Sequence, residues 1–273
     1  MTLAAVLPPP ELASLVALDP ALADALTPDR RRSAASAVRV HVRHVPRGPL
    51  DLSTVQSASA SNIGLLIVDG IVTREVLLGS TVSAELLGPG DIVRPWSLAE
   101  GSELMSTRVR WSVVSENLRA AVLDRRVAKQ LGAYPELAVV LIDRLNDRSS
   151  RLAVTQAISQ LKRVDQRLIA LFTHLGERWG RITPAGVLVP LRLSHQMLGT
   201  LVGASRPTVS TAIGALTRTG ELVRRSDGAW LLAARPADTG VPEMRRVEPR
   251  RAVSINPRRL VRASEAWSHR RPG

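Results

Sequence analysis

The sequence predicts an α+β protein with a β-rich barrel or sandwich first, a long helix next and a winged helix-turn-helix last. Short β-like runs broken by turn residues fill residues 36–123, and many short strands are typical of a sandwich or barrel. No Pro or Gly occurs between Pro135 and Gly176, which favours helical structure there. Residues 193–232 then spell two short helices and a β-hairpin.

The N-terminal half divides into a leader, residues 1–35, and a barrel, residues 36–133. The leader is rich in Ala, Leu and Pro, and we expect an extended segment with a short helix near residues 21–26. Asp69-Gly70 is predicted to be a hairpin turn between two strands, and residues 88–91, Gly-Pro-Gly-Asp, a sharp corner. The strands are expected at residues 38–45, 63–68, 71–78, 82–87, 92–93 and 109–114.

Residues 134–163 are predicted to form a dimerisation helix. Its apolar stripe consists of Leu137, Leu141, Leu145 and Leu152. At a repeat of about 3.5 residues this stripe would pair with the same helix of a second subunit. The polar stretch at residues 146–151 interrupts the stripe, so packing of the helix on its own barrel is the alternative. A break near residues 162–165 is expected to precede an amphipathic helix at residues 168–179.

The winged helix-turn-helix is expected within residues 164–235. Ser194 can cap a first helix, and Gly203 stands just past its end, where a positive φ costs nothing. Ser205 can cap a second helix whose first turn tolerates a proline. Residues 226–228, Ser-Asp-Gly, form the turn of the wing, with Asp-Gly supplying positive φ angles.

Two segments of this region resemble the DNA-binding domain of the Crp/Fnr superfamily of transcription regulators. They are Leu193-Ser194-His195-Gln196 and the stretch from Val202 to Ser210. Gly70 and the corner at residues 88–91 also resemble the cyclic-nucleotide-binding jelly roll that precedes this domain in the superfamily. The resemblance therefore implies a jelly-roll, cyclic-nucleotide-binding-like barrel, a dimer helix and a DNA-reading helix at residues 205–219.

The candidate DNA contacts are small polar or cationic side chains that can lie against phosphates or base edges. They are Ser194, His195, Gln196, Ser205, Arg206, Pro207, Thr208, Ser210, Thr211, Arg218, Arg224 and Arg225. Members that bind the best-known operator use Arg, Glu and Arg on the reading helix, whereas this chain has Arg206, Pro207 and Thr211. The target sequence is therefore expected to differ. Two ordinary core helices with solvated arginines are the alternative, which the agreement of caps, turn and wing disfavours.

Composition supports a nucleic-acid partner. The formal net charge is +13 and the isoelectric point is about 11.5, and all but two of the basic residues are arginines, which suit phosphate. Residues 236–273 hold nine arginines and few apolar residues, and a basic disordered tail is expected there. No apolar run reaches the length of a membrane span and no signal peptide is recognisable, so we expect a cytoplasmic protein.

Enzymatic, metal and cofactor functions find no support in the residues. Cysteine is absent, which excludes disulfides and thiolate ligands. His41 and His44 are three apart, so a strand would point them to opposite faces, and no further ligand is suitably spaced. No catalytic triad, phosphate loop or HExxH pattern occurs. No cofactor is expected.

The effector is expected not to be cyclic AMP bound in the usual way. Nucleotide-binding members of the superfamily carry a Gly-Glu pair for the ribose and an Arg-Ser or Arg-Ala step for the phosphate. Here neither element is intact, because Arg94 replaces the acidic residue and Arg108 is at best a displaced phosphate ligand. Thr155 is similar to the residue that contacts ligand across the dimer. The candidate effector pocket is therefore Arg94, Arg108 and Thr155.

The sequence thus predicts a homodimeric transcription regulator that binds double-stranded DNA, with RNA polymerase as a further candidate partner. A winged-helix module that binds RNA or protein, with the barrel as a scaffold, is the alternative.

Overall fold

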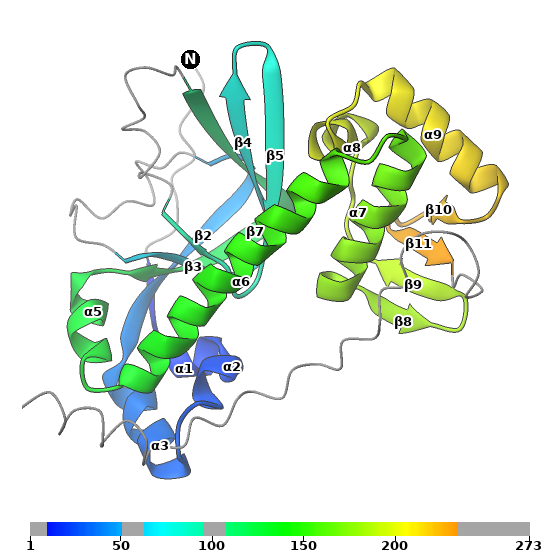
Figure 1. Ribbon diagram of the computed structural model, residues 1–273. Helices are drawn as coiled ribbons and strands as arrows, with labels where there is room; N and C mark the ends of the chain where they lie inside the picture. The colour runs from blue at the N-terminus through cyan, green and yellow to red at the C-terminus, as the bar shows by residue number, and fades with distance from the viewer. Residues whose placement is uncertain (1–9, 51–62, 95–106, 234–273) are drawn as a thin grey trace, which may run out of the picture. The chain divides into compact units, whose positions relative to one another are not determined.

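The computed structural model describes residues 10–50, 63–94 and 107–233 (Figure 1). In the N-terminal part the elements are β1 (Glu11–Ser14), α1 (Leu15–Leu18), α2 (Pro20–Ala23), α3 (Pro28–Ala37), β2 (Arg39–Pro49), β3 (Gly64–Asp69), β4 (Val72–Leu78), β5 (Thr81–Leu87), β6 (Ile92–Val93), β7 (Thr107–Leu123), α5 (Arg125–Leu131) and α6 (Pro135–Ser159). They are followed by α7 (Val164–Trp179), β8 (Arg181–Thr183), β9 (Gly186–Val189), α8 (His195–Val202), α9 (Arg206–Arg218), β10 (Leu222–Arg224) and β11 (Trp230–Ala233). None of these helices has the length and hydrophobicity of a membrane span.

The first sheet is antiparallel and is organised around β7. This long strand pairs with β2 and β3 along its C-terminal part and with β4 along its N-terminal part. β1 extends the sheet beyond β2, β6 extends it beyond β3, and β5 pairs with β4. The alternation of side chains along β7 fills two apolar clusters, because Leu118, Ala120 and Val122 point into one and Ala121 and Leu123 into the other. The expected β-rich N-terminal half is confirmed.

Asp69-Gly70 is not a hairpin turn, contrary to the expectation. β3 and β4 each pair with β7 and not with each other, so this dipeptide carries the chain from one stretch of β7 to the next. Gly70 has φ +93° and its backbone passes so close to β7 that a Cβ would lie 2.4 Å from the Asn117 carbonyl oxygen. The hairpin lies at Gly79, between the paired strands β4 and β5.

The expected extended leader is folded from residue 11 onward. β1 pairs with β2, and the three helices α1, α2 and α3 follow it, where a single helix near residues 21–26 was expected. Leu15 and Leu22 are fully buried in the same apolar cluster as the start of α6. Arg144 of α6 forms a half-buried ion pair with Asp19, which holds this segment on the helix.

Helix α6 presents two different faces. Leu137 and Leu141 are buried in the same apolar cluster as Leu66 of β3, so this half of the predicted stripe packs on its own sheet. Leu145 and Leu152 are exposed to 44% and 36%, together with Ile142 at 56%. The expected single leucine seam is therefore split between a core face and an open apolar face.

The polar stretch of α6 is an attachment to the sheet. Arg148 donates two hydrogen bonds of 2.9 Å to the carboxylate of Glu85 on β5. Arg151, almost one turn further, pairs with Asp91 at the corner before β6. The residues that interrupt the apolar stripe thus bind α6 to β5 and β6.

The C-terminal part builds a third apolar cluster from α7, α8, α9 and a four-stranded antiparallel sheet, ordered β10-β11-β9-β8. Phe172 and Trp230 are fully buried at its centre, with their rings 5.1 Å apart. The expected break after the long helix is confirmed, because α6 ends at Ser159 and α7 begins at Val164. The basic tail expected at residues 236–273 lies outside the described residues.

Candidate nucleic-acid interface

Helices α8 and α9 form the predicted helix-turn-helix. The Ser194 hydroxyl accepts a hydrogen bond of 3.1 Å from the Met197 amide, which caps α8. Gly203 ends α8 with φ +64°, as expected for a left-handed cap. Gly199 makes the turn tight, because a Cβ there would lie 2.6 Å from the Ala204 carbonyl oxygen. The two helices are therefore held in close contact by two glycines and two serine caps.

Helix α9 presents a polar face to solvent. Ser205 caps it through the Thr208 amide at 3.3 Å, and Pro207 occupies the first turn, where no backbone donor is lost. Its apolar face, Val209, Ile213 and Leu216, is buried. The exposed positions of this helix are Arg206, Pro207, Thr208, Ser210, Thr211, Gly214, Thr217 and Arg218. Arg206 and Arg218 thus stand at the two ends of an uncovered face.

The hydroxyl groups of α9 are oriented by the helix itself. Ser210 donates to the Arg206 carbonyl at 3.0 Å, and Thr211 donates to the Pro207 carbonyl at 3.2 Å. Because each proton is used within the helix, each oxygen is left as an acceptor; that of Ser210 lies beside the His195 ring, and Thr211 is exposed to solvent. Acceptors of this kind suit the amino groups of cytosine and adenine in the major groove.

His195 links the two helices. Its Nδ1 lies 2.9 Å from the Ser210 Oγ, and its ring lies 6.3 Å from that of Trp230. Burial of the ring, and then the charges of Arg224 and Arg206, hold the pKa of His195 below its usual value. The imidazole is therefore neutral near pH 7 and already close to positive charges that suit a phosphate. Gln196 follows it, exposed, in the first turn of α8.

The wing places further arginines beside α8. Arg224 at the end of β10 is exposed, with its guanidinium 5.6 Å from the Trp230 ring centre. Arg225 forms a half-exposed ion pair with Asp227 at 3.6 Å. Only Gly228 of the expected Asp-Gly pair has a positive φ, at +86°; Asp227 instead accepts a hydrogen bond from the Ala229 amide.

The sequence did not indicate two further arginines of this region. Arg192 is exposed, and its side chain lies along the wing turn, 3.1 Å from where a Cβ of Gly228 would be. Its place between the buried Leu191 and Leu193 is the alternation that could have identified it. Arg167 of α7 donates to the carbonyls of Leu161, Val202 and Gly203, and so ties the helix-turn-helix to the segment after α6.

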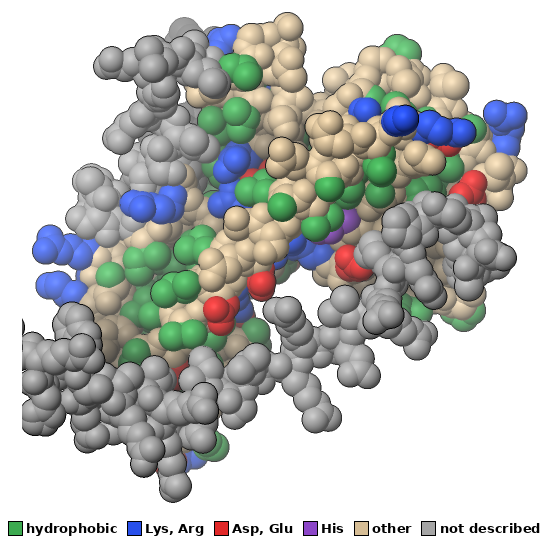
Figure 2. Space-filling model, in the orientation of Figure 1, with side chains coloured by type: hydrophobic (Ala, Val, Ile, Leu, Met, Phe, Trp, Pro, Cys, Tyr) green, Lys and Arg blue, Asp and Glu red, His purple; other side chains and the backbone are tan. Residues whose placement is uncertain are grey.

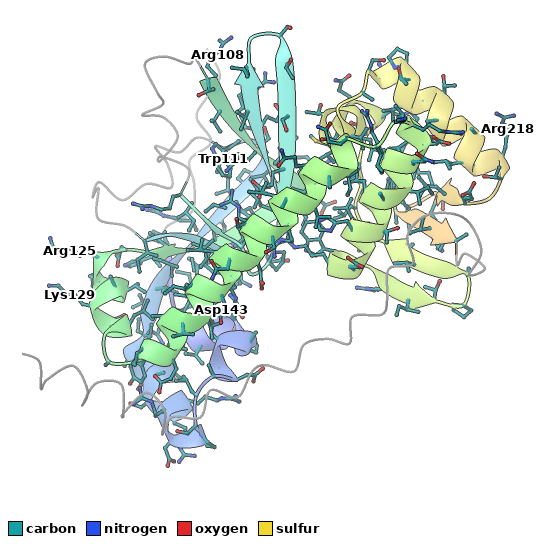
Figure 3. All side chains as sticks on the ribbon, viewed as in Figure 1. Arg108, Trp111, Arg125, Lys129, Asp143 and Arg218 are labelled. Atoms are coloured by element: carbon teal, nitrogen blue, oxygen red, sulfur yellow. The ribbon has the colours of Figure 1, made fainter. Side chains whose placement is uncertain are left out.

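The interface is strongly basic. Arg192, Arg206, Arg218, Arg224 and Arg225 project from α9, the wing and the segment before α8. Figure 2 shows basic side chains over the end of the domain that holds α9, and Figure 3 shows Arg218 pointing away from it. A surface of this kind attracts the phosphate backbone of a nucleic acid.

The three candidate effector residues are not brought together. Thr155 lines a cavity of about 300 Å³ between β4, β5, α6 and α8, together with Arg74, Glu85 and Gln156. Arg94 and Arg108 are exposed, and neither lines this cavity (Arg108 is labelled in Figure 3). Most of the segment between them, residues 95–106, lies outside the described residues.

Metal coordination finds no constellation among the described residues. Across the ranges 10–50, 63–94 and 107–233, no three His, Asp or Glu side chains are grouped to hold an ion. His44 lies 3.5 Å from Glu11 on the neighbouring strand, and His41 is on the same strand, β2, three residues away.

Comparison with known proteins agrees with this geometry. Residues 166–235 match the family of Crp-like helix-turn-helix domains. The regulatory protein CysR of Synechococcus elongatus is 29% identical over 151 residues, which are 54% of this chain and 64% of CysR. The global nitrogen regulator of the same organism is 29% identical over 164 residues, 55% of this chain and 68% of the relative. The chain thus spans about two thirds of the length of the curated relatives that it matches.

Solved structures share the fold. A cyclic nucleotide-binding domain containing protein from Listeria monocytogenes has a TM-score of 0.58 at 14% identity, covering 78% of this chain and 96% of that one. A CooA mutant from Carboxydothermus hydrogenoformans has a TM-score of 0.54 at 18% identity, covering 71% and 83%. The chain thus carries a Crp-like helix-turn-helix domain at residues 166–235 and shares its fold with these solved structures.

Proposed function

We propose that this protein is a homodimeric, sequence-specific DNA-binding transcription regulator that inserts α9 in the major groove. The observation that carries the proposal is the open face of α9, which joins exposed arginines at both ends to hydroxyl acceptors between them. Arg206 stands in the first turn, where the helix N-terminus adds its own attraction for anions. The wing arginines and Arg192 then contact phosphates and fix the register.

The open apolar face of α6 supports the dimer. Ile142, Leu145 and Leu152 follow one another at spacings of three and seven residues, which place them on one side of the helix. Exposed apolar side chains in such a row are typical of an interface. A second copy of α6 covers this face in our proposal. The two reading helices then address half-sites about 34 to 36 Å apart, one turn of duplex.

The remaining assignments follow from this role. Residues 36–133 serve as the sensing barrel, 134–163 as the dimer helix and 164–235 as the reader of DNA. The protein acts without catalysis, and RNA polymerase is the partner through which a bound regulator changes transcription. Any effector differs from cyclic AMP held in the usual way, because Arg94 stands in place of the acidic ribose ligand.

Selection of bound duplexes from a random pool by the full chain tests the proposal, with and without cell extract. We expect enrichment of a two-fold symmetric site whose affinity falls steeply with salt. A parallel pool of random RNA tests the winged module with an RNA partner. Enrichment of RNA alone, or of duplexes without any shared sequence, contradicts the proposal.

A further inference from the structure

The corner between β5 and β6 is packed directly against the C-terminal end of α7. Gly88 lies so close to this helix that a Cβ would come within 2.7 Å of the Trp179 ring. Leu86 of β5 belongs to the same buried apolar cluster as Leu171 and Leu175 of α7. The first helix of the DNA-binding part is therefore docked on the sheet by apolar contacts.

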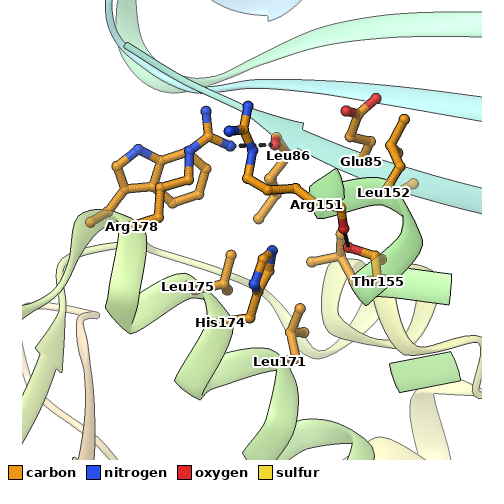
Figure 4. Close-up of a pocket in the computed structure, with 12 residues that line it drawn as sticks. Glu85, Leu86, Arg151, Leu152, Thr155, Leu171, His174, Leu175 and Arg178 are labelled. Carbon is orange, nitrogen blue, oxygen red and sulfur yellow. Dashed lines mark hydrogen bonds between the residues drawn. The ribbon is translucent and has the colours of Figure 1, made fainter. Parts of the chain in front are cut away.

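A buried carboxylate stands at the centre of this contact. Asp91 is 1% exposed, and its Oδ1 lies 2.5 Å from the Arg151 Nη2 of α6. Its Oδ2 accepts from the Gly88 amide at 2.8 Å and from Arg178 of α7. Figure 4 shows the two guanidinium groups meeting beside Leu86. One acidic residue of the sheet thus binds the dimer helix and the DNA-binding part at once.

Arg178 is held in this position by further contacts. It donates to the Leu86 carbonyl at 3.4 Å, and its guanidinium lies 4.2 Å from the centre of the Trp179 ring. Its side chain is 18% exposed, and Asp91 is buried, so breaking this pair would leave a buried charge without one of its partners. The contact is therefore specific in geometry and costly to lose.

The space beside Arg151 and Arg178 is too small for an effector. The cavity lined by Arg151, His174 and Arg178 has a volume of about 30 Å³, which suits one or two water molecules. Burial, and then the charges of Arg151 and Arg178, lower the pKa of His174, so the imidazole adds no third positive charge near pH 7. This region is a joint between helices rather than a ligand site.

The docked arrangement leaves the reading face of α9 open. Arg206, Thr208 and Thr211 are all exposed while Asp91 holds α7. The contact therefore does not cover the DNA-binding surface. It fixes the direction in which that surface points relative to α6.

We propose that Asp91 and Arg178 form a latch that positions α8 and α9 relative to the dimer helix and so presets the separation of the two reading helices. The inference rests on the proposed dimeric DNA-binding function. Arg178 acts as a positioning residue and does not touch DNA. With the latch released, each reading helix still binds its half-site, but the pair must be ordered at the moment of binding, which costs affinity.

A distance measurement tests the latch without DNA. Because the chain has no cysteine, spin labels can be placed at Ser80→Cys in the β4–β5 turn and at Ser226→Cys in the wing, with labelled chains diluted by unlabelled ones. We expect one narrow distance distribution, which Arg178→Gln broadens. Arg181→Gln removes the same charge from an exposed position of β8 and should change nothing. An unchanged distribution in Arg178→Gln overturns the latch.

A binding comparison tests its consequence. For a selected duplex with both half-sites, Arg178→Gln should lower affinity on the order of tenfold, whereas affinity for a duplex with one half-site should stay the same. Asp91→Asn should act alike, and the double variant should be no weaker than either single one. Arg178→Lys, which keeps the charge, serves if Arg178→Gln unfolds. An equal loss on both duplexes, or a gain, overturns the latch. Failure of the unmodified protein to bind any duplex overturns the proposed function instead.

Discussion

His195 and Ser210 join the two helices of the helix-turn-helix, with the imidazole Nδ1 2.9 Å from the serine Oγ. This hydrogen bond ties the start of α8 to the exposed face of α9, so it orients the Ser210 side chain, which we place in the major groove. The same imidazole has a lowered pKa, first from burial and then from Arg224 and Arg206.

This relationship predicts a pH-dependent affinity. A phosphate near the imidazole favours its charged form, so the pKa of His195 rises on DNA binding from its lowered value in the free protein. Binding then takes up a proton, and affinity should increase as pH falls through and below the ordinary histidine range near 6.5. Titration of DNA affinity between pH 5.5 and 8 (roughly the range in which histidine changes charge) measures this.

His195→Asn is the matched control, because an amide can still bond to Ser210 but does not titrate. It should keep most of the affinity at pH 8 and show no increase at lower pH. A pH profile identical to that of the unmodified protein would place the titrating group elsewhere.

Arg206 and Arg225 are predicted to make different contributions to DNA binding, Arg206 to sequence preference and Arg225 to general affinity. Arg206→Ala should weaken specific binding by about 1 to 3 kcal/mol and relax the preference at one base pair, since a guanidinium can bond a guanine with two donors. Arg225→Ala should weaken binding to all sequences alike and reduce the salt slope by about one unit. The affinity lost in Arg225→Ala should be small, because the Arg225 guanidinium is already paired with the Asp227 carboxylate at 3.6 Å. Affinities over a series of salt concentrations and operator variants separate the two.

Arg206→Ala also tests whether α9 is the reading helix. If Arg206→Ala leaves affinity and base preference unchanged in a folded protein, α9 is not the reading helix. Arg218→Ala, at the other end of the same face, then identifies whether any part of this helix reaches DNA.

The helix-turn-helix could be predicted from sequence because local chemistry decides it. Ser194, Gly203 and Ser205 each act through their own backbone or the next turn, and the structure places each one as a cap. The elements of the wing follow from the same short-range rules. Signals confined to a few residues are readable without knowledge of the rest of the fold.

Predictions from the sequence were wrong or incomplete where segments distant in the chain meet. Asp69-Gly70 has the composition of a hairpin, but pairing of both flanking strands with β7 overrides it. The polar stretch of α6 looked like an interruption, and its purpose appears only when Glu85 and Asp91 come to face Arg148 and Arg151. Likewise, no spacing could show that Arg94 and Arg108 would remain exposed while Thr155 lines a cavity.

Cyclic AMP and cyclic GMP are predicted not to bind with low-micromolar affinity. Their phosphate needs a charge-assisted partner, and Arg108 is exposed on β7 and does not line the cavity with Thr155. Isothermal titration of the full chain should give no saturable heat. Low-micromolar binding of either nucleotide contradicts the prediction. Loss of such binding in Arg74→Ala would then place the nucleotide in the 300 Å³ cavity.

The two faces of α6 are predicted to respond differently to substitution. Ile142→Asp places a charge on the open apolar face, so it should shift the protein to monomers with little change in the free energy of unfolding. Leu137→Ala empties a fully buried position and should cost about 2 to 5 kcal/mol of stability while leaving the dimer intact at low temperature. Sedimentation and thermal unfolding of both variants measure the two effects.

Leu78→Asp is the control for Ile142→Asp, since Leu78 on β4 is exposed to 48%, close to the 56% of Ile142, but lies off this helix. If Ile142→Asp sediments as the unmodified protein does, and that protein is a dimer, the subunits meet through another surface. If the unmodified protein is a monomer at concentrations where it binds its operator, the dimer itself is refuted.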